Sequence, residues 1–189
     1  MVAQRPDHER TYDSTATAMA GSVNSATLRR FAGRVRWETT TRYATTNTEL
    51  NDLGFVTLIN DFQFRNQISF STLAPTRLSR RANAVLSSEQ HWTTGGLPTG
   101  FTAQAHAAAE LANFWSASVT WNASQLGATH CVSCARGGPA LRLSPSHRLT
   151  LTLDGDARRA LTPGLDFRVT RGDDGRSWSR QVGIGAAGR

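Results

Sequence analysis

The sequence predicts an all-β protein built as an antiparallel up-and-down meander, an open or partial barrel of roughly eight to ten strands. Three observations lead to this fold class. Apolar and polar residues alternate with a period of two in several segments, and polar, Gly-rich turns separate these segments. Only 39% of the residues are hydrophobic, and Thr, Ser, Ala and 16 Gly are abundant. Each strand would therefore present one apolar and one polar face.

The first two strands are expected over Phe31–Tyr43 and Phe62–Ser71. In the first, one parity is aromatic or β-branched, and the other carries Arg and Glu. In the second, four apolar residues oppose Gln, Arg and Ser. The turn-like segment Asn51–Gly54 precedes the second strand, and Pro75 ends it because proline cannot donate a ladder hydrogen bond.

The middle of the chain predicts two strands, Phe101–Leu111 and Trp115–Asn122. The alanine content of Phe101–Leu111 also permits a helix. In Trp115–Asn122, aromatic and apolar residues alternate strictly with Ser, Thr and Asn, a pattern that a period of 3.6 residues cannot produce. This segment is therefore expected to be a strand.

The last third predicts three strands, at Arg148–Asp154, Leu165–Thr170 and Trp178–Ile184. A loop at Gly155–Arg159 joins the first two into a hairpin, and the turn Gly172–Gly175 leads into the third. Weaker alternating runs add further candidate strands at Tyr12–Ala20, Leu53–Asn60, Leu78–Trp92 and Ala140–Ser144. Since no linker or repeat divides the chain, we expect a single domain over residues 1–189.

The charge pattern bears on the partners of the chain. The formal net charge is +7, and all 21 basic residues are Arg. These arginines are dispersed along the sequence, whereas nucleic-acid binding requires a basic cluster on one face. We therefore expect no nucleic-acid partner. No apolar run reaches the roughly 18 residues that a membrane-spanning helix requires, and residues 1–8 do not resemble a secretion signal.

Two features favour a membrane barrel over a soluble sandwich. Long polar residues on one parity suit a water-filled lumen, and aromatic residues near strand ends suit a girdle at the membrane surface. The candidate lumen-lining residues are Arg34, Arg36, Arg42, Arg65, Arg148 and Arg168. The candidate girdle residues are Trp37, Tyr43, Phe101, Trp115, Trp121 and Trp178.

Four segments occur in the order seen in one protein family: Arg5–His8, Glu49–Phe55, Arg136–Leu143 and Asp173–Trp178. The sequences Asn-Asp-Leu-Gly-Phe and Arg-Gly-Gly-Pro within them are the most specific. Over nearly its whole length the chain resembles the barrel-forming C-terminal region of bacterial outer-membrane proteins. That region is a domain of unknown function, often fused behind a family-9 carbohydrate-binding module.

The resemblance implies a non-enzymatic segment of a barrel in the bacterial outer membrane, with the lipid bilayer as its partner. Our leading hypothesis for such a barrel segment is a contribution to solute or glycan passage across that membrane. The sequence contains neither the secretion signal nor the carbohydrate-binding module of that family. Its last residues, Gly185–Arg189, also lack the terminal aromatic residue that is usual in outer-membrane strands. We therefore expect a fragment whose two sheet edges would pair with the missing remainder of the barrel.

Cys131 and Cys134 are the only cysteines, spaced as Cys-x-x-Cys. A structural zinc site needs four ligands, and no second pair exists. We expect a loop disulfide, with metal binding by this pair and His130 as the weaker alternative. The five histidines are scattered, and no Gly-x-Ser-x-Gly motif is present. The sequence thus predicts no enzyme, no catalytic residue, no metal and no cofactor.

Two functional alternatives remain open. The first is a soluble β-sandwich that binds carbohydrate, in which Trp37, Trp115 or Trp121 stacks on sugar rings. The second is an accessory part of a glycan-degrading enzyme. For the arginines, a lumen that favours anionic solutes competes with ordinary barrel lining in which Glu38, Asp154 and Asp166 neutralise them, and the second interpretation is the simpler.

Overall fold

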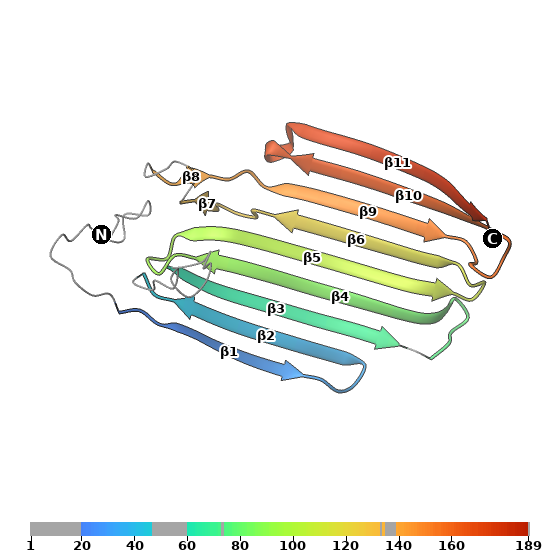
Figure 1. Cartoon of the computed structure of the whole chain (residues 1–189), viewed down its shortest axis with the longest axis horizontal. Coiled ribbons are helices and arrows are strands. Elements are labelled where there is room, and N and C mark those ends of the chain that lie inside the picture. The colour runs from blue at the N-terminus through green and yellow to red at the C-terminus, as the bar shows by residue number, and fades with distance from the viewer. Residues whose placement is uncertain (1–19, 47–59, 73, 133, 135–138, 189) are drawn as a thin grey trace.

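One large antiparallel sheet of nine strands dominates the structure (Figure 1). The computed structural model describes residues 20–46, 60–72, 74–132, 134 and 139–188. The strands of the large sheet are β1 (Val23–Arg30), β2 (Val35–Ala44), β3 (Asp61–Thr72), β4 (Ser79–Trp92), β5 (Pro98–Leu111), β6 (Ser116–Ser124), β9 (Ser146–Asp154), β10 (Leu161–Gly172) and β11 (Ser177–Gly188). This confirms the predicted all-β meander.

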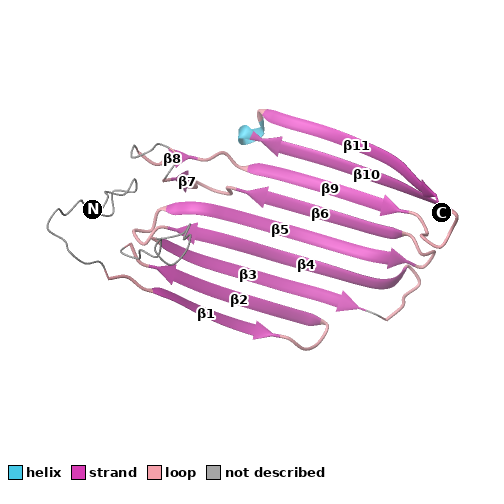
Figure 2. Cartoon of the chain, in the orientation of Figure 1, coloured by secondary structure: helices cyan, strands magenta, loops and turns pink. Residues whose placement is uncertain are grey.

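The strands follow one another in the sheet in the order β1-β2-β3-β4-β5-β6-β9-β10-β11. The excursion between β6 and β9 forms a separate two-stranded sheet of β7 (His130–Cys131) and β8 (Leu141–Arg142). One 3₁₀ turn, Asp173–Gly175, separates β10 from β11 (Figure 2). Among the described residues, β1 and β11 are the two outer edges, and the sheet does not close between them.

The strand ends are displaced stepwise across the sheet. The cross-strand row that starts at Val35, the first residue of β2, reaches Val182 in β11 by way of Phe70, Ala84, Ala107, Val119, Leu151 and Phe167. Whereas β2 begins at this row, β11 continues past it to Gly188. The strands therefore run obliquely to the line that joins the strand ends across the sheet.

The connections differ between the two ends of the sheet (Figure 1). At the end we call the short-turn end, the strands are joined through residues 31–34, 73–78, 112–115 and 155–160. At the opposite, long-loop end they are joined through residues 45–60, 93–97, 125–145 and 173–176. The two longest connections of the sheet thus lie at the same end.

The structure corrects the predicted first strand. Phe31 and Arg34 lie in the turn between β1 and β2, so the strand starts at Val35. Strand β1 was not predicted, because Val23–Arg30 contains few large apolar residues and its alternation is weak. It pairs with β2 over its full length, from Val23 opposite Ala44 to Arg30 opposite Trp37. Pairing with a strongly patterned neighbour therefore determines the conformation of this segment.

The alanine-rich segment forms strand β5 and not a helix. Its small side chains lie between larger ones, since Ala105 is opposite Leu86 on β4 and opposite Trp121 on β6. Cross-strand packing with these bulky neighbours outweighs the helix propensity of alanine. The weak run Leu78–Trp92 is confirmed as strand β4.

The remaining weak runs have different outcomes. Ala140–Ser144 contains only the two-residue strand β8. Apart from their last residues, Tyr12–Ala20 and Leu53–Asn60 lie outside the described residues, as does the turn Asn51–Gly54. The strand ahead of Pro75 ends at Thr72, as predicted.

The described residues build almost no hydrophobic core. Ala44 and Ala123 are the only buried hydrophobic residues among them. The large sheet is thus a single layer whose stability comes from ladder hydrogen bonds and cross-strand side-chain pairs. Both of its faces are accessible, and each of them is a candidate functional surface.

Candidate functional site

The alternation seen in the sequence separates the side chains of the sheet into two faces. We call the first the apolar face; its large members include Leu28, Val35, Trp37, Tyr43, Phe62, Phe64, Ile68, Phe70, Leu86, Trp92, Phe101, Val119, Trp121, Leu149, Leu151, Leu153, Leu165, Phe167, Val169, Trp178, Val182 and Ile184. We call the second the polar face; it includes Arg29, Arg36, Glu38, Arg42, Asp61, Gln63, Arg65, Glu89, His91, His106, Asn122, Arg148, Asp166, Arg168 and Gln181. The registers of all nine strands preserve this separation.

The apolar face is uncovered. Ile68 is 51% exposed, Leu86 is 55% exposed and Leu151 is 40% exposed, although all three lie well inside the sheet. Phe167 is only partly buried. A soluble monomer rarely exposes a contiguous apolar surface of this extent. The face therefore requires an apolar covering.

The charged residues on the apolar face lie near strand ends. Arg30 is the last residue of β1, Arg171 is close to the end of β10, and Arg180 is close to the start of β11. The Arg180 guanidinium carbon lies 5.0 Å from the centroid of the Trp178 ring. Long basic side chains in such positions can extend their charge past the edge of an apolar layer.

A histidine between two carboxylates joins β3 to β4 on the polar face. His91 Nδ1 lies 3.0 Å from Asp61 Oδ1, and His91 Nε2 lies 2.9 Å from Glu89 Oε1. The Asp61 side chain is only 4% exposed. Because carboxylates accept hydrogen bonds, both ring nitrogens can donate at the same time when the imidazole is protonated.

Three further side chains complete this group, which we call the histidine cluster: Asp61, Glu89, His91, Arg42, Arg65 and Gln63. Arg42 Nη1 lies 3.8 Å from Asp61 Oδ2, and Arg65 Nε lies 3.1 Å from Glu89 Oε2. Gln63 Nε2 donates a hydrogen bond of 2.8 Å to Glu89 Oε1. Opposite charges on β2, β3 and β4 thus neutralise one another.

Hydrogen bonds to hydroxyl groups extend across the polar face away from the histidine cluster. His106 Nδ1 lies 2.9 Å from Thr120 Oγ1, which links β5 to β6. Hydroxyl pairs link β1 to β2 and β6 to β9: Thr27–Thr40 at 3.0 Å, Ser118–Thr152 at 2.5 Å and Ser124–Ser146 at 2.7 Å. The polar face thus carries the side-chain hydrogen bonds that a wetted surface needs.

Five of the six predicted lumen arginines lie on the polar face: Arg36, Arg42, Arg65, Arg148 and Arg168. Arg34 does not, because the turn between β1 and β2 contains it; its carbonyl oxygen accepts a hydrogen bond of 3.0 Å from the Ser71 N–H. Arg34 therefore lies in the turn at the short-turn end and not on a strand of the polar face.

The arginines on the polar face differ in their partners. Arg42 and Arg65 have carboxylate partners in the histidine cluster, and Arg36 Nη2 lies 3.5 Å from Ser71 Oγ. Within the described part of the chain, Arg148 and Arg168 have no ion-pair partner.

The carboxylates proposed to neutralise the arginines are placed differently than expected. Glu38 pairs with Arg29, at 3.9 Å, and not with a predicted lumen arginine. Asp154 and Asp166 form no ion pair with any described residue. Among the strands described, ion pairs therefore occur from β1 to β5, and those of Asp156 lie in the turn between β9 and β10.

The predicted girdle residues lie at different positions along the strands. Tyr43, Phe101 and Trp178 lie near the long-loop ends of β2, β5 and β11. At the other end, Trp115 immediately precedes β6, and Trp37 is close to the start of β2. Trp121 lies inside β6, where its ring stacks on that of His147 with centroids 6.1 Å apart. Trp121 is therefore not at a strand end.

Two aromatic residues that sequence reasoning did not assign to the girdle lie beside Tyr43. Phe62 is opposite Tyr43, and Trp92 is opposite Phe62, with ring centroids 5.7 Å apart. These three residues form an aromatic row across β2, β3 and β4 at the long-loop end. Their positions at the ends of alternating runs were a signal in the sequence, but only the register aligns them.

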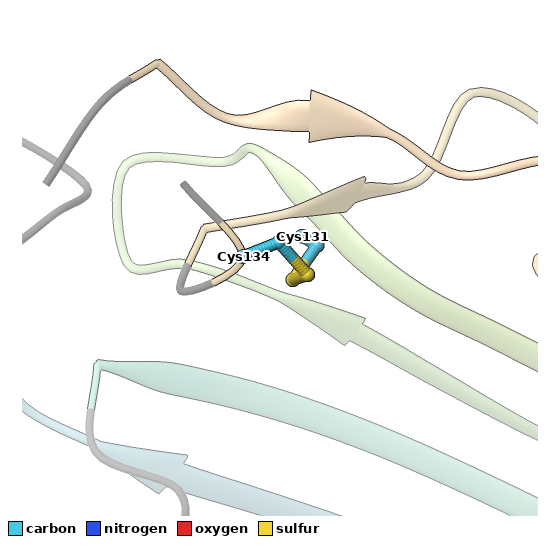
Figure 3. The surroundings of a disulfide bond; sticks show 2 residues. All are labelled: Cys131 and Cys134. Atoms are coloured by element: carbon cyan, nitrogen blue, oxygen red, sulfur yellow. A yellow bond between two sulfur atoms is a disulfide. The ribbon is translucent and has the colours of Figure 1, made fainter. Parts of the chain in front are cut away.

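Cys131 and Cys134 form a disulfide in the excursion between β6 and β9 (Figure 3). Their Cα atoms are 5.6 Å apart. His130, the third candidate ligand of a metal at this pair, belongs to β7 together with Cys131. In the described ranges no group of three or more His, Cys, Asp or Glu residues could hold a metal ion.

No helix in the described part of the chain is long and apolar enough to cross a membrane. A family model described as "Domain of unknown function (DUF5916)" matches residues 6–187. No curated protein and no solved structure matches the chain.

Proposed function

Given that this chain belongs to the DUF5916 family of domains of unknown function, we propose that it is a non-enzymatic segment of a bacterial outer-membrane β-barrel. In this proposal the apolar face contacts lipid, and the polar face lines a water-filled lumen. The remainder of the barrel supplies strands that pair with β1 and β11, and the barrel follows a family-9 carbohydrate-binding module in the whole protein. The barrel contributes to the passage of solutes or glycans.

The observation that carries this proposal is the uncovered apolar face. Transferring one large apolar side chain from water to an apolar environment contributes about 1.5–3 kcal/mol. Nearly all globular domains obtain this contribution from a buried core, but Ala44 and Ala123 are the only buried hydrophobic residues in the described ranges. Lipid tails supply the missing apolar environment without a second protein layer.

The strand lengths support the proposal. β3, β10 and β11 have 12 residues each, and β4 and β5 have 14 each. A tilted strand needs about 9–11 residues to cross the hydrocarbon region of a bilayer. The stepwise displacement of strand ends from Val35 to Gly188 is what strand tilt in a barrel produces.

The ends of the sheet support it as well. Outer-membrane barrels have short turns on the periplasmic side and longer loops outside. By this rule the long-loop end, with the disulfide of Cys131 and Cys134, faces the exterior. The aromatic row of Tyr43, Phe62 and Trp92 would then lie at the outer membrane surface.

The carbohydrate-binding sandwich gains no comparable support. Sugar-binding aromatic residues need hydrogen-bonding groups beside them to recognise hydroxyls. Trp37 and Trp121 belong to one cross-strand row of the apolar face, together with Ile68, Leu86 and Leu149. Each has a single polar neighbour, Arg30 opposite Trp37 and His147 stacked on Trp121, among mainly apolar side chains. The surroundings of these tryptophans therefore fit contact with lipid better than contact with sugar hydroxyls.

Cysteine labelling of the whole protein in isolated membranes tests the proposal. Leu151→Cys places a thiol on the apolar face, and Thr150→Cys, its neighbour on β9, places one on the polar face. We expect a water-soluble, membrane-impermeant maleimide to label Thr150→Cys and to leave Leu151→Cys unlabelled until denaturant is added. Ile68→Cys and Gln67→Cys form a second matched pair on β3. Equal labelling within both pairs, or recovery of the protein in the soluble fraction, would refute the proposal.

A further inference from the structure

We propose that Arg148 and Arg168 form an anion-contact site on the wall of the lumen, so that the solutes that pass carry carboxylate or phosphate groups. This inference rests on the proposed function and names the class of solute. It concerns the only two arginines on the polar faces of β9 and β10.

The two arginines are neighbours on the same face. Arg148 is opposite Thr170, and Arg168 is opposite Thr150, which makes them a diagonal pair across the β9–β10 ladder. Long side chains at diagonal positions can reach one another. Two guanidinium groups can therefore approach one ligand from adjacent strands.

Neither arginine forms an ion pair with a described residue, in contrast to Arg42 and Arg65. The nearest carboxyl groups on the same face, Asp154 and Asp166, lie further toward the short-turn end. The Asp166 carboxylate lies over Gly183, where no side chain occupies the space. Positive and negative groups are thus separated along these strands, and the positive pair is nearer the long-loop end.

The groups beside the arginines are neutral and can donate hydrogen bonds. Asn122 on β6 is opposite Arg148, and Gln181 on β11 is opposite Arg168. Amide side chains and the hydroxyl of Thr150 can complete the coordination of an anionic oxygen. The planar guanidinium group binds carboxylate and phosphate through two parallel hydrogen bonds, which a lysine ammonium cannot do.

Unpaired like charges on one wall create a local positive potential. Two adjacent guanidinium groups repel each other, and an anion between them relieves this repulsion. In a lumen with low-dielectric walls the field is stronger than on an open surface, so the local concentration of anions rises. The pair therefore favours the passage of anions over cations.

Ion selectivity of the whole protein in a planar lipid bilayer tests the inference, with potassium chloride as the probe. Under a salt gradient we expect the sign of the reversal potential to show that chloride is more permeant than potassium. The Arg148→Gln/Arg168→Gln double variant should lower the chloride-to-potassium permeability ratio several-fold. The Arg148→Lys/Arg168→Lys double variant keeps the charge and should keep most of the ratio. Arg180→Gln removes one charge from the apolar face of β11 and should leave the ratio unchanged.

The outcomes separate the inference from the proposed function. If the protein conducts and the double glutamine variant keeps the wild-type ratio, the inference is wrong while the barrel remains. If the protein inserts, with the expected cysteine labelling, but conducts no ions, the inference is also wrong, because the arginines then line no pathway. If the protein does not enter membranes, the proposed function fails and the inference fails with it.

Discussion

The guanidinium carbon of Arg158 lies 3.1 Å from the centroid of the Phe114 ring, which joins the turn between β9 and β10 to the turn between β5 and β6. The guanidinium carbon of Arg80, at the start of β4, lies 3.9 Å from the same ring. Phe114 has φ = 67°, a left-handed conformation that is uncommon for a bulky residue. Contacts with two cations compensate for this backbone conformation and hold three strand ends together.

Replacing Phe114 by leucine should destabilise the short-turn end. The variant keeps an apolar side chain and the same backbone requirement but loses both cation–π contacts, each worth about 0.5–1 kcal/mol at exposed sites. We expect a lower urea midpoint in detergent micelles, corresponding to a loss of about 1–2 kcal/mol. Phe31→Leu is the control, because Phe31 contacts the single cation Arg29, at 4.4 Å. Equal midpoints for Phe114→Leu and wild type would contradict the role assigned to the ring.

Asp156 in the same turn should make stability depend on pH in acid. The side-chain hydrogen bonds from Arg158, at 2.8 and 2.7 Å, lower the pKa of Asp156 to about 2, and the backbone N–H of Arg158 adds to this effect. Since the folded pKa lies below the ordinary value of 3.8, the charged carboxylate stabilises the fold above pH 4, and this contribution is lost as the pH falls toward 2.

The measurement compares wild type with Asp156→Asn across this pH range. Because all other carboxyl groups titrate in both proteins, the difference between their urea midpoints isolates Asp156. We expect this difference to be constant from pH 7 to about 5 and to decline below about 4. A difference that stays the same down to pH 2 would show that the charge of Asp156 contributes nothing.

The sequence predicted those parts of the fold that depend on local pattern. Period-two alternation located the middle of every strand whose apolar parity carries large residues, as in Trp115–Asn122. It did not locate β1. Inside this strand Leu28 is the only large apolar residue, and both of its sequence neighbours are polar. It also began the strand that corresponds to β2 too early, at Phe31, since a residue of suitable parity in a turn looks the same as one in a strand.

The candidate sites depend on register, which the sequence does not encode locally. Asp61 and His91 are separated by 30 positions, and they meet only because Gln63 is opposite His91 in the β3–β4 ladder. The same holds for Arg148 and Arg168. A shift of one residue in either ladder would place one partner on the opposite face. Parity could therefore assign these side chains to a polar face but could not pair them.

Removing the imidazole of the histidine cluster should lower the stability of the fold. In His91→Ala, the Asp61 carboxylate, 4% exposed, keeps Arg42 Nη1 at 3.8 Å but loses its contact at 3.0 Å. Leaving a buried charged acceptor without its hydrogen bond costs about 1–3 kcal/mol. We expect a corresponding decrease in the urea midpoint, partly restored in His91→Gln, whose amide can donate to one carboxylate.

His106→Ala is the matched control for the histidine cluster. His106 also lies on the polar face, but its ring contacts the neutral hydroxyl of Thr120 and no carboxylate. Its removal should cost about 1 kcal/mol, as expected for an ordinary hydrogen bond. If His106→Ala were as destabilising as His91→Ala, the pairing with Asp61 and Glu89 would not be the reason for the loss.

Gly155 should not tolerate a side chain, because the chain returns closely upon itself after β9. A Cβ atom on Gly155 would lie 2.5 Å from Pro163 Cδ, and the Gly155 N–H already donates a 2.7 Å hydrogen bond to the Pro163 carbonyl oxygen. The proline ring cannot rotate away, so the hairpin between β9 and β10 must shift. We expect Gly155→Ala to lose about 1–3 kcal/mol of stability, as other overpacked sites do.

Gly185→Ala is the control, since nothing lies within 4 Å of a Cβ atom there. The alanine should be neutral or slightly stabilising in the strand interior. Similar urea midpoints for the two variants would mean that the approach of Pro163 to Gly155 does not restrict this turn.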